Sequence, residues 1–274
     1  MRGPIAVVLS AALLTSSCGL FAGDGTSPPI PKVDLVGVVN AGNSPGGSAL
    51  LYRIDPVTGD VSERGWTGTD FVNALAYDPA SRRVFGVASV SGGPDDLYTM
   101  DLETGAATLV GSVGFDAVWG LAFDGNTRTL YGTTGNKELI TIDMKTGAGT
   151  LVGKTLKPDG RVLRCFALAF DPYRNVLYGT IPNRFVLIDP GTAACTLFDN
   201  SIFEAEVERN GRTRRVTQAV QGLAYDPFAR ILYGVTDPQA SDIDARLLVI
   251  DPTTGLGSEL RVLPHPMRSL APIF

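Results

Sequence analysis

Residues that commonly perform catalytic chemistry are scarce in this chain of 274 residues. There is one histidine, His265, so the two-histidine HExxH arrangement of metalloproteases is excluded, and a Ser-His-Asp triad would have to use that residue. The three cysteines cannot form a Cys₄ zinc site. The remaining acid–base chemistry therefore depends mainly on the 28 acidic residues and on where the fold places them.

Two sets of residues stand at fixed distances before a repeated Leu-Ala motif, and they would form two rings if the copies are structurally equivalent. The first ring, five residues before the motif, contains Asp70, Asp116, Leu163, Gln218 and His265. The second ring, two residues before the motif, contains Asn73, Trp119, Phe166, Gln221 and Arg268. Asp70, Asp116 and His265 would be neighbours that could bind a divalent cation, or a polar ligand stacked on Trp119. The candidate ligand residues are therefore Asp70, Asp116, His265, Arg268, Asn73 and Trp119, and the first three are also the candidate metal ligands.

A structural role accounts for the same residues. Asp70 and Asp116 each follow a glycine by two positions and could simply cap turns. His265 lies between two prolines, which is typical of a rigid surface turn. Trp119 and Phe166 could pack inside a channel. Both interpretations stay open, and no cofactor is expected beyond the candidate divalent cation.

Strands must position these residues, because four short motifs recur along the chain. Copies of the Leu-Ala-(Tyr/Phe)-Asp motif begin at Leu75, Leu121, Leu168 and Leu223, with a decayed copy at Leu270. A Leu-Tyr-Gly-like motif, an Ile-Asp or Met-Asp motif and a Thr-Leu-Val-Gly-like motif follow in constant order. Each motif is rich in β-branched and aromatic residues and is bounded by turn residues, as expected of strands. The five aspartates that end the Ile-Asp or Met-Asp motif begin turns such as Asp-Pro-x-Thr-Gly, and they are expected to cap those turns and to be structural. They are Asp55, Asp101, Asp143, Asp189 and Asp251.

The order of the motifs predicts an all-β, five-bladed β-propeller over residues 33–274. The chain begins with the last three strands of a unit, continues with four full units, and ends with a single first strand at 268–274. About 48 residues per unit suit a four-stranded blade. Pairing of the C-terminal strand with the N-terminal blade would close the ring and remove exposed sheet edges. The motifs resemble those of propellers with NHL-like or YWTD-like blades, which implies the fold but no particular function.

The fourth unit has an insertion at residues 203–216. Asn210-Gly211, flanked by alternating residues, predicts a hairpin that stands over the loop face of the propeller. It is either a solvated ladder of charges or a docking or lid element. The loops 40–48 and 237–246 are expected to enlarge the same face.

The two internal cysteines are predicted to be unpaired and buried. Cys165 is assigned to the innermost strand of one blade and Cys195 to its outermost strand. Three strand spacings would separate them by roughly 14 Å, which is too far for a disulfide.

The N-terminus has the features of an export signal: Arg2, an apolar stretch over residues 5–14, and small residues before Cys18. The segment from Leu14 to Gly19 resembles the lipobox of bacterial lipoproteins. That resemblance implies a signal peptide at 1–17, cleavage before Cys18 and acylation of Cys18, for example with palmitate. Residues 18–32, rich in Pro and Gly, would then be a tether. The expected location is the cell envelope, anchored to a membrane by lipid, with the outer membrane favoured over the inner. The alternative is an ordinary secretory signal.

The sequence predicts a general class of function and not a specific ligand or reaction. A formal net charge of −5 and the lack of a basic run argue against nucleic acid as a partner. The favoured hypothesis is a lipid-anchored binding or scaffold module whose loop face meets an envelope protein or a small polar ligand. The alternatives are a metal-assisted hydrolase, which would work through Asp70, Asp116 and His265, and a sugar-binding lectin. No catalytic residue is assigned, because the starts of the inner strands contain no pair of acids.

Overall fold

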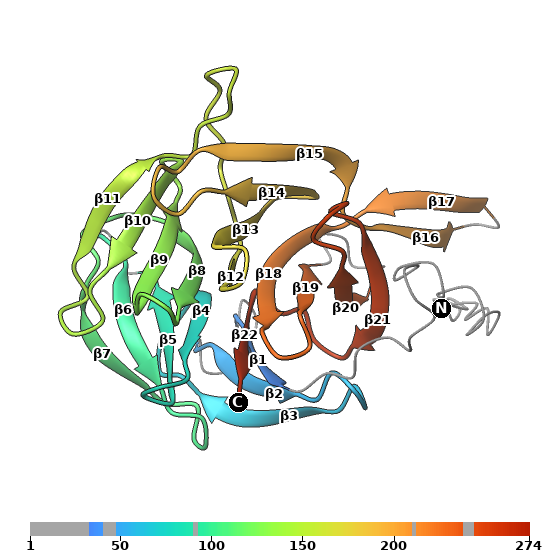
Figure 1. Cartoon of the computed structure of the whole chain (residues 1–274). Helices are drawn as coiled ribbons and strands as arrows, with labels where there is room; N and C mark the ends of the chain where they lie inside the picture. Colours follow the sequence, from blue (N-terminus) through green and yellow to red (C-terminus); the bar gives the residue numbers. More distant parts are fainter. Residues whose placement is uncertain (1–32, 41–47, 90–92, 210–211, 238–243) are drawn as a thin grey trace.

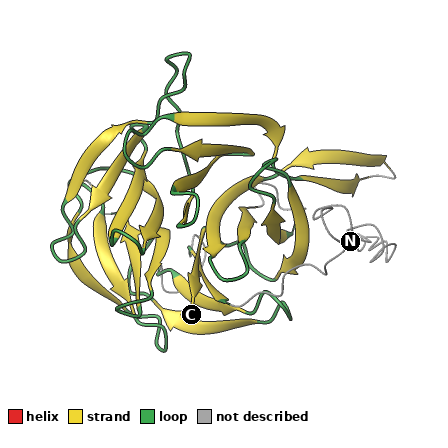
Figure 2. Cartoon of the chain, viewed as in Figure 1, coloured by secondary structure: helices red, strands yellow, loops and turns green. Residues whose placement is uncertain are grey.

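The computed structural model describes residues 33–40, 48–89, 93–209, 212–237 and 244–274. The predicted signal peptide 1–17, Cys18 and the tether 18–32 lie outside the described residues, as do parts of the loops 40–48 and 237–246. Regular structure in the described part consists of β-strands (Figure 2). No helix in that part is long and apolar enough to cross a membrane.

Five antiparallel four-stranded sheets surround a central axis (Figure 1). The first blade contains β22 (Ser269–Ile273), β1 (Asp34–Val39), β2 (Leu50–Ile54) and β3 (Val61–Trp66). The second contains β4 (Val72–Asp78), β5 (Arg83–Ala88), β6 (Asp96–Met100) and β7 (Ala107–Ser112). The third contains β8 (Val118–Asp124), β9 (Thr129–Thr134), β10 (Glu138–Ile142) and β11 (Gly149–Lys154).

The fourth blade contains β12 (Leu168–Asp171), β13 (Val176–Ile181), β14 (Arg184–Ile188) and β15 (Cys195–Ser201). The fifth contains β18 (Ala219–Asp226), β19 (Ile231–Asp237), β20 (Ala245–Ile250) and β21 (Gly257–Leu263). The predicted five-bladed β-propeller is therefore confirmed.

The two ends of the described chain meet in the first blade. β22 pairs antiparallel with β1, with Asp34 opposite Ile273 and Val38 opposite Ser269. Ser269 also contacts the second blade, because its Oγ accepts a hydrogen bond of 2.8 Å from the backbone N–H of Leu75. This arrangement is consistent with the predicted closure of the ring.

Burial differs between the inner and the outer strands. Every residue of β4 is buried except Asn73, which is half-buried, because the strand packs between the inner strands β22 and β8 of neighbouring blades. The outer strand β7, in contrast, has three exposed and three half-buried positions. An inner strand buried on both faces needs a nearly continuous apolar sequence, which the Leu-Ala motif supplies.

The turns between the third and fourth strands are capped by aspartate. In the turn after β6, Oδ1 of Asp101 accepts the N–H groups of Glu103 at 2.9 Å and Thr104 at 2.8 Å. These hydrogen bonds, with that of the Thr104 hydroxyl, hold the pKa of Asp101 below its ordinary value. The geometry agrees with the structural role predicted for this aspartate and its counterparts.

Glycines allow adjacent blades to touch at the outer strands. Gly65 of β3 lies against the backbone of Thr104, and Gly111 of β7 lies in the same way against Thr146. A Cβ atom at either glycine would come closer to the threonine carbonyl oxygen than any real contact allows. The repeated glycine in the fourth motif is therefore a packing requirement between blades.

The insertion in the fourth unit is a hairpin, as predicted. Its strands are β16 (Glu204–Arg209) and β17 (Arg212–Thr217), and the Asn210-Gly211 turn lies outside the described residues. Glu206 and Arg215 face each other across the strands, with 3.3 Å between Oε1 and Nε. Figure 1 shows the hairpin extending outward from the ring and not across its centre, whereas the sequence predicted a hairpin that stands over the loop face.

Cys165 and Cys195 are free and buried, as predicted. The strand assignment of Cys165 is wrong, however, because β12 begins three residues later, at Leu168. Cys165 lies in the preceding connection and belongs to the same apolar cluster as Cys195, so the estimate of three strand spacings between them does not apply. Burial raises the pKa of both thiols, that of Cys195 to about 12.

Candidate ligand site at the mouth of the channel

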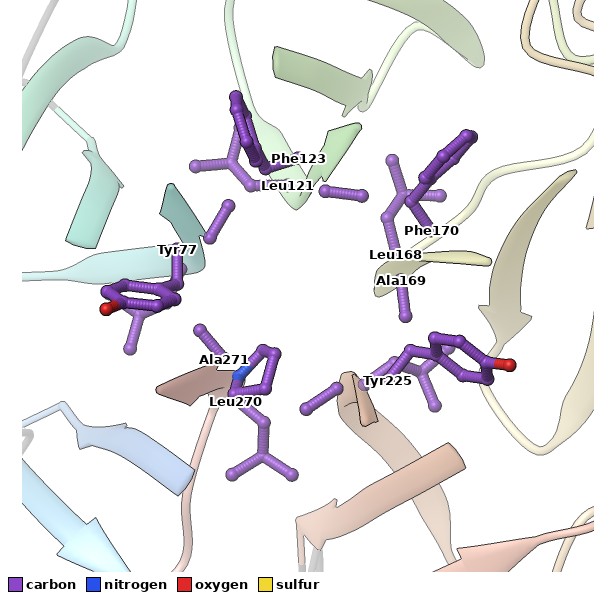
Figure 3. A pocket seen from close by; sticks show the side chains of 15 residues that line it. Tyr77, Leu121, Phe123, Leu168, Ala169, Phe170, Tyr225, Leu270 and Ala271 are labelled. Carbon is purple, nitrogen blue, oxygen red and sulfur yellow. The ribbon is translucent and has the colours of Figure 1, made fainter. Parts of the chain in front are cut away.

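The inner strands β4, β8, β12, β18 and β22 surround a narrow channel along the axis. Residues of the Leu-Ala motif from all five strands line a cavity of about 50 Å³ (Figure 3). Their side chains are almost all apolar, and the cavity is too small for an organic ligand. The repeated motif therefore forms the body of the channel and not a binding site.

A larger cavity lies where the inner strands begin, and we call it the mouth cavity. Its volume is about 330 Å³, which is at the lower end of the range for small-molecule sites. It is lined by Asn40, Phe71, Asn73, Trp119, Phe166, Gln221 and Arg268. All five residues of the predicted second ring thus line one cavity, while their binding of a ligand stays a prediction.

Aromatic residues from the third and fourth blades form one part of the lining. The rings of Trp119 and Phe166 are stacked, with centroids 4.9 Å apart and planes within 2° of parallel. The guanidinium of Arg164 lies over Trp119, 5.1 Å from the ring centroid. The two rings pack against each other, as the structural interpretation expects, and they also contribute surface to the cavity.

The amide of Asn73 is held in one orientation. Its Nδ2 donates a hydrogen bond of 2.7 Å to Oγ of Ser89 and lies 3.5 Å from Oδ2 of Asp95. Since these two acceptors hold the NH₂ group, the carbonyl Oδ1 lies on the other side of the amide.

Asp95 is the buried partner behind Asn73. Asp95 is only 3% exposed, and its Oδ2 accepts a hydrogen bond of 2.7 Å from the backbone N–H of Val118. Burial raises the pKa of Asp95, although the hydrogen bond from Val118 acts in the opposite direction. Asp95 precedes β6 in the second blade and binds the first residue of β8 in the third, so it fixes the two blades at the mouth.

Asn40 and Phe71 complete the lining; the loop 40–48 was expected at this face, but neither residue was among the predicted ligand residues. Oδ1 of Asn40 accepts the N–H of Val72 at 2.9 Å, which leaves the NH₂ group on the opposite side of the amide. Phe71 is 49% exposed, an unusual value for so large an apolar side chain. Asn40, Phe71 and Asp95 belong to connections outside the repeated motifs, where only tertiary contacts show their positions.

The first predicted ring does not gather at the cavity. Asp70 and Asp116 are exposed and are not among the lining residues. His265 is also exposed, and its ring lies 5.1 Å from the ring of Tyr52 in β2. Among the described residues, no group of three or more His, Cys, Asp or Glu side chains could hold a metal ion. Metal binding by Asp70, Asp116 and His265 has no support from the geometry and stays a prediction.

Comparisons with known proteins show the fold of the chain. No protein-family model and no curated protein matches the sequence. A chain in a crystal structure of a nidogen/laminin complex is similar at a TM-score of 0.55 and 12% identity, over 88% of this chain and 98% of that one. TolB from Acinetobacter baumannii is similar at a TM-score of 0.53 and 14% identity, over 88% of this chain and 66% of TolB. A structural genomics protein of unknown function from Bacteroides thetaiotaomicron is similar at a TM-score of 0.54 and 19% identity, over 86% of this chain and 59% of that one.

Proposed function

We propose that the protein is a lipid-anchored binding protein of the cell envelope that holds a small polar ligand in the mouth cavity. The main support is the convergence of one residue at or just before the start of each inner strand on a single cavity of about 330 Å³. Aromatic surface combined with a few fixed polar groups is the usual composition of a small-molecule site.

The asymmetry of the lining supports a single ligand. A propeller with five equivalent pockets would present similar residues in every blade, but here Asn73, Trp119, Phe166, Gln221 and Arg268 all differ in chemistry or in size. A ligand at this site would meet aromatic surface on one side and amide and guanidinium groups on the other. This difference favours one defined orientation and disfavours a lectin with repeated sugar pockets.

The course of β1 indicates how an anchored molecule would stand. β1 ends next to Asn40 at the mouth and begins with Asp34, which pairs with Ile273 at the opposite end of β22. Five strand steps place this beginning about 17 Å from the mouth. A chain anchored through Cys18 would thus enter the propeller at the end away from the mouth cavity, which would leave the cavity open toward the compartment.

Thermal-shift measurements with a panel of small polar compounds test the binding proposal. A compound that binds the cavity should raise the Tm of the native protein, since ligand binding stabilises only the folded state. The Trp119→Ala variant should lose the shift. Tyr173→Ala is the matched control, because this aromatic side chain is 59% exposed and lies at the opposite end of the inner strands. A shift that persists in Trp119→Ala would contradict the proposal.

Mass spectrometry of the protein extracted from cell membranes tests the anchor separately. We expect an N-terminal peptide that begins at Cys18 and has the added mass of acyl chains. The Cys18→Ser variant should lose this mass and leave the membrane fraction. An unmodified mature N-terminus at another residue would contradict lipid anchoring and would leave the binding proposal unaffected.

A further inference from the structure

We infer that the ligand of the mouth cavity is a small organic carboxylate with a hydroxyl or amide group near the carboxylate. This inference rests on the proposed function, since it names the ligand class of the same site. Three features of the lining lead to it: the presence of the Arg268 guanidinium, the fixed orientation of two amides, and the position of the aromatic stack.

The described lining contains a guanidinium group. Among the described residues that line the cavity, the charged side chain is Arg268, and the guanidinium of Arg164 lies over Trp119 close by. The carboxylate of Asp95 is buried behind Asn73 and accepts the N–H of Val118, so it is not part of the lining. A guanidinium binds a carboxylate through two parallel hydrogen bonds, which gives this anion an advantage over a neutral ligand.

The two asparagines present opposite hydrogen-bonding groups. Asn73 uses its NH₂ group on Ser89 and therefore offers its carbonyl oxygen as an acceptor. Asn40 uses its carbonyl oxygen on the N–H of Val72 and therefore offers its NH₂ group as a donor. A ligand group that can both donate and accept satisfies the pair, and hydroxyl and secondary amide groups have this property.

The positions of these groups around the ring give the ligand a direction. Asn40 and Arg268 flank the strands β1 and β22 of the first blade, and Asn73 lies in β4 of the second. Trp119 and Phe166 belong to the third and fourth blades. The carboxylate would therefore point toward the first blade, while an apolar or flat face of the ligand would contact the aromatic stack.

Two sources provide this chemistry: acidic sugars, and acylated amino acids such as the C-terminal residue of a peptide. Isothermal titration calorimetry with the full chain can distinguish them with four probes. Glucuronate is compared with glucose, and N-acetylphenylalanine with its amide, so that each pair differs in the anionic group. We expect at least one acid to bind with a Kd at least tenfold lower than its neutral partner, and the acid that binds identifies the source.

Substitutions at the cavity test whether the preference for the acid arises there. Arg268→Gln should weaken binding of the acid at least tenfold and leave the neutral partner unchanged, while the backbone N–H of Arg268 still donates to Val38. Asn73→Asp should also weaken it, because a second carboxylate replaces the amide beside Asp95. The matched control is Arg161→Gln, an exposed arginine paired with Asp159 in the connection before β12. Thermal melts verify that each variant is folded.

Three results would overturn the inference. They are equal affinity of the acid and its neutral partner in both pairs, unchanged binding of the acid by folded Arg268→Gln, and no binding of either acid. The proposed function would survive them if a neutral compound raises the Tm of the native protein but not that of Trp119→Ala. Failure of the ligand class and failure of the binding site are therefore separate outcomes.

Discussion

Removal of the last strand should abolish folding of the propeller. A chain that stops at Arg268 loses β22, in which Leu270 is 1% exposed and Ala271 is 1% exposed. Burial of one leucine contributes about 2 kcal/mol. The hydrogen bonds from Leu75 N–H to Ser269 and from Tyr77 to the carbonyl of Phe274 contribute about 1 kcal/mol each. Loss of the backbone hydrogen bonds between β22 and β1 removes several more kcal/mol, so the total loss approaches the whole free energy of unfolding of a typical domain.

Circular dichroism melts of the truncated chain and of two milder variants provide the assay. Leu270→Ala should lower the free energy of unfolding by about 2–5 kcal/mol and still fold. Phe274→Ala is the control, because its side chain is 43% exposed and its carbonyl group remains available to Tyr77. The Phe274→Ala substitution should lower the free energy of unfolding by about 1 kcal/mol. A truncated chain that melts cooperatively within a few degrees of the full chain would show that the reasoning about closure is wrong.

Three further predictions concern packing, pH and the thiols. Gly111→Ala should lower the free energy of unfolding by about 1–3 kcal/mol in urea titrations, because Cβ would meet the neighbouring turn, whereas Gly93→Ala has open space and should be neutral. Burial raises the pKa of Asp95, so the native state binds this proton more tightly and loses stability as the pH rises above about 3.9. The Tm of Asp95→Asn relative to the native protein should therefore increase from acidic to neutral pH, and a constant difference would contradict this assignment. Cys165 and Cys195 should resist a thiol reagent in the folded protein and react fully in denaturant, and rapid labelling of either in the folded state would contradict their burial.

The fold could be predicted from the sequence because its repeats encode both strands and turns. Leucine, alanine and aromatic residues recur where strands are buried on both faces, and aspartates recur where turns need a cap. The incomplete unit at each end of the sequence predicted which strands meet in the first blade, and the pairing of β22 with β1 agrees with it.

The second ring could be predicted because it lies within or beside the inner strands. A residue two positions before the motif keeps the same height in every blade, so alignment of the copies placed Asn73, Trp119 and Arg268 around one opening. The first ring lies three residues farther out, in connections of different length and course. Equivalence in the sequence no longer means equivalence in space there, and His265 contacts Tyr52 in β2 and is not among the residues that line the mouth.

Other features of the site depend on contacts between distant parts of the chain. The orientation of Asn73 is set by Ser89 and Asp95, which have no counterpart in a repeated motif. The direction of the β16–β17 hairpin likewise depends on how its base packs, since Asn210-Gly211 specifies a turn but not where the hairpin points. Local sequence therefore predicted the elements, and tertiary packing decided their chemistry at the mouth.

A fluorescence titration tests the mouth cavity most directly, because the chain has two tryptophans and one of them lines it. Trp66, which is 45% exposed on β3, can be replaced by Phe, so that Trp119 becomes the sole indole. Titration of this variant with the carboxylate that calorimetry identifies should change the emission of Trp119 with the same Kd as the calorimetric one. Full calorimetric binding without any change in the emission of Trp119 would place the ligand elsewhere and contradict the assignment of the site.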